Sequence, residues 1–216
     1  MVMSDVTGKK VAQTLEHVAI KIESSKDYLC ELDGAVGDGD HGVSMTIGMR
    51  SVARAVKKLP ESVLPQEVFQ VAAEAYAEEV GATIGPLYEA AFAAAARAVQ
   101  GRCSLNSISD WAEIYGAMAQ AIKSLGNAEL GDKTILDALI PAAEHIKKLA
   151  TEGGSLKDAL TSSGEIALSS AVSTKDLVPK KGRAARLGDR AAGHQDAGAT
   201  SLAIVLEAFA EGISSD

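Results

Sequence analysis

Aromatic side chains are scarce in this chain. Phe, Tyr and Trp together make up 4% of its 216 residues, whereas apolar residues as a whole make up 47%, with a heavy share of alanine. Aromatic and β-branched residues are the ones enriched in strands, and alanine is the strongest helix former. The composition therefore predicts an all-α protein of closely packed helices.

Cysteine is also scarce, and long apolar runs are missing. Cys30 and Cys103 lie far apart in the sequence and have no metal-ligand spacing, so we expect free thiols in a reducing cytosol. No signal-peptide pattern and no uninterrupted apolar run of about 18 residues is present. These observations predict a soluble cytoplasmic protein that is not inserted in a membrane.

Positive charge is in deficit, because the formal net charge is −8. Nucleic acids and anionic membranes are therefore not expected partners, and any anionic ligand must meet local positive charge. Residues 175–198 supply such charge, with six Lys or Arg against three Asp. A loop this long inside a compact domain is usually functional, and its glycines suggest a lid over anions.

The length of the chain suits one domain, which we place over residues 1–216. Apolar residues at helical spacing, bounded by turn signals, predict eight helices. The expected ranges are 9–28, 43–59, 66–80, 86–99, 109–125, 134–150, 155–174 and 199–212. Ser109 and Ser155 are the expected N-caps of two of them, Ser155 with Asp158 as its capping partner, and Pro141 should kink or interrupt the sixth.

Residues 33–42 form the most unusual stretch, with three carboxylates and four glycines in ten positions. Carboxylates this close repel one another unless a cation compensates them. Oxygen ligands suit a hard divalent ion, and the glycines allow Asp33, Asp38 and Asp40 to converge. The stretch predicts a Mg²⁺ site, with an Asx-rich turn that caps the following helix as the alternative.

Three familiar motifs fit this chain only in part. Residues 37–42 satisfy G-x-G-x-x-G, but two aspartates there would repel a pyrophosphate. Asp38 and Asp40 begin a calcium loop whose later positions do not fit. Residues 126–134 resemble a P-loop, but Asp132 stands between the second glycine and the lysine. Phosphates could therefore bind at the aspartates only through intervening cations.

Four segments together resemble a known family, the nucleotide-binding L subunit of dihydroxyacetone kinase. These segments are residues 33–45, 81–87, 126–137 and 181–201, in the family's order and across nearly the whole chain. The resemblance implies an eight-helix antiparallel barrel that binds ADP or ATP at one end through two Mg²⁺ ions.

The resemblance also implies roles for particular residues. The metal ligands would be Asp33, Asp38 and Asp40, and Arg183 would join them in stabilising charge during phosphoryl transfer. The nucleotide contacts would be His41, Gly42, Val43, Ser44, Thr83, Ile84, Gly126, Ile135, Arg183, Asp196, Ala197 and Gly198. Simpler roles stay open for some of them: Thr83 as a helix cap, His41 as a residue that orients the loop, and Arg183 as part of a solvated basic loop.

The resemblance extends to partners. A separate K-type subunit would hold the ketone, a phosphotransferase-system protein could supply the phosphate, and a homodimer is expected. The acceptor would be dihydroxyacetone or a similar ketose such as erythrulose, and relatives also include a fatty-acid kinase. A different class of function also stays open, an ADP-binding regulatory or adaptor module without turnover.

Four positions depart from the usual family pattern. Ala82 and Ile84 replace a glycine and a serine in the 81–87 turn, Ser44 stands where asparagine is common, and Ala197 stands where proline is common. The change at Ile84 removes a hydroxyl that the resemblance would place near phosphate. We therefore expect rearranged phosphate contacts.

Overall fold

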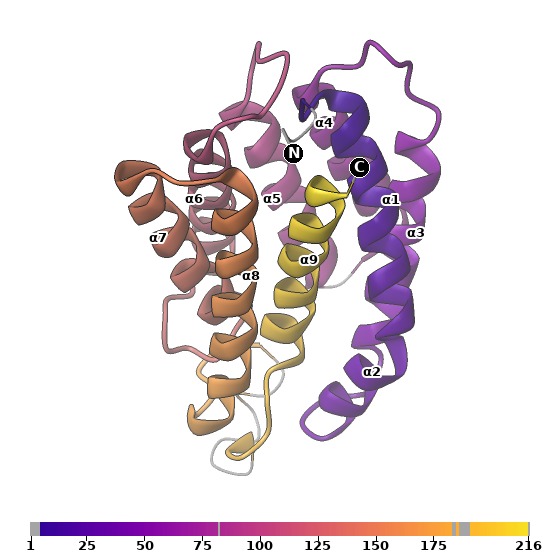
Figure 1. Ribbon diagram of the computed structural model, residues 1–216. Coiled ribbons are helices and arrows are strands. Elements are labelled where there is room, and N and C mark those ends of the chain that lie inside the picture. Colours follow the sequence, from indigo (N-terminus) through magenta and orange to yellow (C-terminus); the bar gives the residue numbers. More distant parts are fainter. Residues whose placement is uncertain (1–4, 82, 183–184, 186–190, 216) are drawn as a thin grey trace.

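The computed structural model describes residues 5–81, 83–182, 185 and 191–215, and this part of the chain is all-α, as predicted (Figure 1). It contains nine α-helices and one short 3-10 helix. They are α1 (Gly8–Ser24), α2 (Lys26–Gly34), α3 (His41–Val56), α4 (Pro65–Glu79), α5 (Ile84–Ala98), α6 (Ile108–Gly126), α7 (Leu136–Glu152), α8 (Leu156–Ser173), η1 (Thr174–Asp176) and α9 (Ala197–Ser214).

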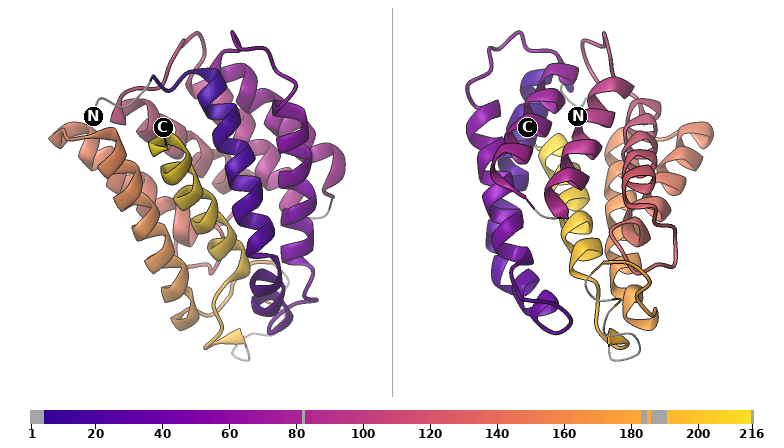
Figure 2. Two further views of the ribbon diagram at one scale, coloured as in Figure 1. Left: turned by 45° about the vertical axis from the view of Figure 1, so that its right-hand side comes forward. Right: turned by 180° about the vertical axis from the view of Figure 1, so that it is seen from behind.

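Eight of the described helices close into a ring. Each packs against the next in the order α1, α3, α4, α5, α6, α7, α8 and α9, and α9 returns to α1. Successive helices run in opposite directions, which the views from front and back both show (Figures 1 and 2). The expected eight-helix antiparallel barrel is confirmed, with α2 as an additional short helix at the lower end.

The additional helix corrects the expectation of one helix over residues 9–28. Apolar residues of the first helix face the core up to Ile22, and the chain then breaks at Ser25, whose N–H bonds to Lys21 O and Ile22 O at 3.1 Å. A new helix starts at Lys26 with Leu29 as its buried residue. The first helix buries eight residues and the second buries Leu29 alone, so the second is held mainly by its contacts with α3 and α9.

The interior of the ring is a continuous apolar core. Trp111 of α6 meets Phe209 of α9 with ring centroids 5.8 Å apart, and Tyr76 of α4 stacks on Tyr88 of α5 at 4.9 Å. Alanines fill much of the remaining contact between helices, which lets the backbones approach closely. The few aromatic residues of the sequence are thus concentrated where the barrel needs volume.

One expectation about the helix ends was wrong and one is confirmed, and the expected kink or interruption at Pro141 is settled only for the interruption. The N-cap of α6 is Ser107 rather than Ser109, because Ser107 and Asp110 form a reciprocal capping box. Helix α7 is not interrupted at Pro141, which occupies its second turn. Ser155 caps α8 as expected, accepting a bond from the Asp158 N–H at 3.0 Å.

Helix α9 is the most apolar element. Within the described residues it is the one helix long and apolar enough to cross a membrane by length and composition, with a mean hydropathy of 1.2. However, 72% of that helix is buried inside the barrel. Its apolar surface therefore serves the core of this fold.

Candidate functional site

Four connections lie at the lower end of the barrel in Figure 1, because the helices alternate in direction. They enclose a cavity of about 340 Å³. Its described lining residues come from all four connections and the adjoining helix ends. They are Asp33, Val36, Asp40, His41, Ser44, Thr83, Ile84, Leu87, Ile122, Gly126, Ala128, Lys133, Thr134, Ile135, Lys181, Gly182, Asp196, Ala197 and Gly198.

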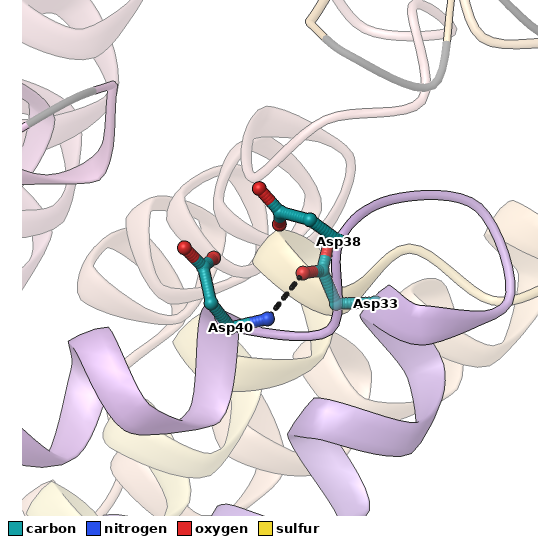
Figure 3. A group of neighbouring side chains, drawn as sticks. All are labelled: Asp33, Asp38 and Asp40. Carbon is teal, nitrogen blue, oxygen red and sulfur yellow. Dashed lines mark hydrogen bonds between the residues drawn. The ribbon is translucent and has the colours of Figure 1, made fainter.

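The acidic loop forms one wall of this cavity. Asp33 lies in the last turn of α2 and Asp40 is the residue before α3, so two helix ends hold the loop in place. Ligand oxygens of Asp33, Asp38 and Asp40 lie within 4.8 Å of one another (Figure 3). Asp33 Oδ2 accepts bonds from the N–H groups of Asp40 at 3.0 Å and His41 at 3.3 Å.

A glycine makes this arrangement possible. A Cβ atom added at Gly37 would lie 2.5 Å from Asp33 Oδ1, so a side chain there would collide with the carboxylate. Gly39 has φ of 76°, a left-handed conformation that favours glycine. The converging oxygens fit a hard divalent cation such as Mg²⁺, which uses one or two carboxylates and leaves positions for water and phosphate.

Helix N-termini form much of the remaining rim. Helices α3, α5, α7 and α9 all begin at this end, since they are alternate members of the antiparallel ring. Each N-terminus carries partial positive charge, which favours an anion. The acidic wall and the helix ends are thus complementary to a metal-bound anion.

Most of the predicted site residues are brought together. Asp33, Asp40, His41, Ser44, Thr83, Ile84, Gly126, Ile135, Asp196, Ala197 and Gly198 line the cavity, and Asp38 completes the carboxylate group. Two residues lie elsewhere: Val43 is exposed outside the cavity, and Gly42 packs so closely on α2 that an added Cβ would lie 2.0 Å from Lys26 O. Arg183 and Ala82 lie outside the described residues.

The simpler roles of two residues can now be compared with the structure. Thr83 holds the N-cap position of α5 without a side-chain capping bond, and it also lines the cavity. His41 is buried, and its Nε2 lies 2.9 Å from Ser201 Oγ, which donates to Gly198 O at 3.0 Å. The imidazole therefore links the first turn of α3 to the first turn of α9.

Asp196 precedes α9 and caps it. Its Oδ2 accepts a bond from the Ala199 N–H at 2.7 Å. Burial raises the pKa of the Asp196 carboxyl from its ordinary value of 3.8 to about 6, and the negative charges of Asp137 and Asp33 act in the same direction. The Ala199 amide and the Lys133 ammonium partly oppose that rise in pKa. This carboxylate would therefore be stabilised by further positive charge in the cavity.

Sequence reasoning expected residues 175–198 to cover an anion, but it did not identify the particular described residues on the cationic side of the cavity. Lys133, Lys181 and Gly182 line it, although none of them was among the predicted site residues. Lys133 is a buried lysine in the left-handed region, with φ of 60°. The imperfect P-loop at residues 126–134 contained the signal, because a lysine in such a loop is a typical phosphate ligand.

The fold and site define a helical barrel domain with a carboxylate-rich loop and several helix N-termini around one cavity. The DAK2 domain family matches residues 35–211 of the chain, and the protein belongs to this family. It is a member of a kinase family.

Known relatives agree with this assignment. The chain is 34% identical over 190 residues to the PEP-dependent dihydroxyacetone kinase, ADP-binding subunit DhaL, of Escherichia coli, across 87% of this chain and 88% of that subunit. It is also 34% identical over 215 residues to the D-erythrulose kinase of Mycolicibacterium smegmatis, across 97% of this chain but 37% of the relative. This chain therefore corresponds to about a third of that longer kinase.

A solved structure shares the fold. The crystal structure of the dihydroxyacetone kinase from C. freundii in complex with AMP-PNP and Mg²⁺ superposes with a TM-score of 0.69 and 27% sequence identity. The match covers 97% of this chain and 35% of that one.

Proposed function

We propose that this protein is the ADP-binding subunit of a dihydroxyacetone kinase-type phosphotransferase. The single observation that supports this most strongly is the convergence of Asp33, Asp38 and Asp40 within 4.8 Å at the wall of a cavity surrounded by helix N-termini. Such a wall disfavours a bare polyphosphate and favours one that carries cations. The E. coli relative is named as an ADP-binding subunit, which supports the same ligand.

In this proposal the three aspartates hold two Mg²⁺ ions. When bound, these ions neutralise phosphate charge and orient the phosphoryl group. The protein's own part is positioning: Asp33 fixes the loop through the N–H groups of Asp40 and His41, and the α3 and α5 N-termini offer amide donors. Ile135 and Leu87 offer an apolar wall for the base. Arg183 is proposed from the family resemblance to add charge stabilisation.

The phosphoryl acceptor in this proposal is a short ketone held by a separate K-type subunit. Dihydroxyacetone is the first choice, because the E. coli relative aligns over most of its own length. A relative from Lactococcus lactis is named as the ADP-binding subunit of a PTS-dependent dihydroxyacetone kinase, which supports a phosphotransferase-system protein as the source of phosphate. We further propose a homodimer in the cytoplasm, with residues 1–216 acting as one domain.

A related acceptor is the second candidate. The D-erythrulose kinase of M. smegmatis matches 97% of this chain, which makes erythrulose a reasonable substrate for the same phosphoryl donor. The departures at Ser44, Ile84 and Ala197 all lie on the cavity lining, so they bear on nucleotide affinity more than on the choice of ketone.

Two measurements test the proposal. Isothermal titration of the purified chain with ADP should show tight binding in Mg²⁺ and little or none in EDTA. A coupled assay with a K-type subunit should then show phosphorylation that depends on dihydroxyacetone or erythrulose. Tight Mg·ADP binding with no turnover on any ketone would instead favour a regulatory ADP-binding module, and no Mg·ADP binding at all would exclude both.

A further inference from the structure

Lys133 is the most deeply buried charged side chain described in this protein, with 2% exposure. Its residue adopts φ of 60°, which is uncommon for a non-glycine residue. Burying an ammonium group is costly unless it is hydrogen-bonded, and a left-handed lysine adds backbone strain. Both features of Lys133 cost stability, so we expect its side chain to make interactions that offset this cost.

The side chain of Lys133 joins two distant points of the chain. Its Nζ donates to Leu177 O at 3.0 Å and to Ala191 O at 2.7 Å. Both carbonyls belong to residues 175–198, the basic segment between α8 and α9, and they lie before and after Lys181 in the sequence. One ammonium group therefore holds both arms of that segment together.

The neighbouring backbone strengthens this attachment. The Lys180 N–H donates to Asp132 O at 3.1 Å, and Lys180 Nζ lies 3.4 Å from Asp132 Oδ1. At the base of the segment, the Gly193 N–H donates to Lys175 O at 2.9 Å. Asp132 and Lys133 thus contact the basic segment at several points, and Lys133 is the more deeply buried of the two.

The loop that carries Lys133 is itself held firmly. Asp137 Oδ1 accepts from the Gly131 N–H at 2.6 Å, and Asp137 Oδ2 accepts from the Thr134 N–H at 2.7 Å. Asp132 Oδ2 accepts from the Glu129 N–H at 2.9 Å. A carboxylate that gathers several amides makes a rigid support, so the position of Lys133 is fixed from the α7 side.

We propose that Lys133 is a positioning residue that fixes Lys181 over the cavity. Lys181 and Gly182 both line the cavity, and they lie between the two carbonyls that Lys133 holds. In this role Lys133 acts on the bound anion through Lys181. The inference rests on the proposed function, because the anion is taken to be the phosphate tail of Mg·ADP.

Two simpler roles predict different behaviour. If Lys133 contacts phosphate directly, as a P-loop lysine does, its loss and the loss of Lys181 should have additive effects. If Lys133 only stabilises the fold, its loss should lower the melting temperature and leave the environment of Lys181 unchanged in the folded protein. A positioning role predicts non-additive effects and a changed Lys181.

The test compares wild type with K133M, K181A and the double variant by titration with Mg·ADP. We expect K133M and K181A each to weaken binding about tenfold, the size of one charged hydrogen bond. The double variant should bind within about twofold of K133M alone. The matched control is K123M, which removes an exposed lysine at the same end, whose Nζ lies 3.3 Å from Glu129 Oε1; it should bind as wild type.

A second readout follows Lys181 directly. Chemical acetylation of lysines, measured by mass spectrometry with and without Mg·ADP, should show Lys181 protected by the nucleotide in wild type. In K133M at saturating Mg·ADP this protection should be lost, while exposed Lys157 at the far end reacts equally throughout. A stabilising role alone would not change the protection of Lys181.

Several results would overturn the inference while leaving the proposed function intact. They are wild-type affinity in a folded K133M, full additivity in the double variant, or equal Lys181 protection in wild type and K133M. K133A, which removes the donor without adding apolar bulk, is the second variant; if K133M does not fold, a folded K133A of wild-type affinity would also overturn it. Failure of wild type to bind Mg·ADP would instead overturn the proposed function, and this role with it.

Discussion

The two charged walls of the cavity are built in opposite ways. The acidic wall comes from residues 33–40, a continuous stretch between two helix ends. The cationic wall is assembled from segments that are distant in sequence, since Lys133 bonds to carbonyls 44 and 58 residues away. A local motif therefore supplies the negative wall, and tertiary contacts formed when the barrel closes supply the positive wall.

This difference affects how each wall depends on the rest of the protein. The acidic loop is fixed by its own glycines and by bonds between near neighbours, such as Asp40 N–H to Asp33. The cationic wall depends on the α6–α7 loop meeting the segment before α9. A substitution in the acidic loop should therefore change metal binding directly, whereas a substitution at Lys133 should act through another residue.

The largest effect is expected from removal of a carboxylate in the acidic wall. Asp38→Ala should weaken Mg·ADP binding by at least about a hundredfold, because a hard cation depends on charged oxygen ligands. The metal-free protein should remain folded, because the substitution also removes like-charge repulsion within the loop. Titration calorimetry and thermal unfolding in EDTA measure the two quantities.

A nearby aspartate provides the control. Asp27 lies on α2 with a side chain that is 97% exposed and 3.5 Å from Lys26. Asp27→Ala should leave the affinity for Mg·ADP unchanged. Equal affinity in D38A and wild type would remove the acidic wall from the metal site.

Asp196 lies between the two walls and should make stability depend on pH. Its pKa is raised to about 6 in the folded protein, so the folded state binds its proton more tightly than the unfolded state does. The contribution to stability is therefore present at low pH and is lost as pH rises from about 4 through about 6.

Asp196→Asn removes this titration and keeps an N-cap of similar quality. One pKa unit corresponds to about 1.4 kcal/mol, and the side chain is only partly buried. As pH rises from about 4 to about 7, the free energy of unfolding of D196N should therefore increase by about 1 to 2 kcal/mol relative to that of wild type. Denaturant unfolding in EDTA at the two pH values measures the difference. A difference that does not change with pH would contradict the raised pKa.

A single methyl group should distort the acidic wall. Gly37→Ala places a Cβ atom 2.5 Å from Asp33 Oδ1, so the carboxylate must move, and we expect about a tenfold loss in Mg·ADP affinity. Gly116 on α6 is the matched control, because an added Cβ there meets nothing within 4 Å. Gly116→Ala should keep full affinity and add up to about 1 kcal/mol of stability. Identical affinities in the two variants would show that Asp33 does not need its observed position.

The smallest effect is expected at the far end of the barrel. Ser107→Ala removes the capping box of α6 and should cost about 1 kcal/mol of stability, with no change in Mg·ADP affinity. Ser109→Ala, two residues later, should have almost no effect on the free energy of unfolding. Chemical denaturation distinguishes the two serines, and the opposite ranking would restore Ser109 as the cap.

Local patterns identified the helices better than their ends. The 3.6-residue pattern located all eight members of the ring, but it did not reveal the break at Ser25 or choose Ser107 over Ser109 as a cap. Two serines near one helix start look alike in sequence, and the position of Leu105 and Trp111 in the core decides between them. Pro141 shows the same limit, because α7 continues through it although proline lacks the amide hydrogen of a regular helix.

The sequence by itself determined that this protein is helical and that Asp33, Asp38 and Asp40 converge. Alanine content favours helices and glycine spacing allows a tight loop, and both effects involve only neighbouring residues. They can therefore be recognised in the sequence alone. Only the tertiary structure decided that Lys133 is buried, that Lys181 lies over the cavity and that Val43 faces away from it. Those facts depend on contacts made when the ring closes, and no short stretch of sequence contains both partners.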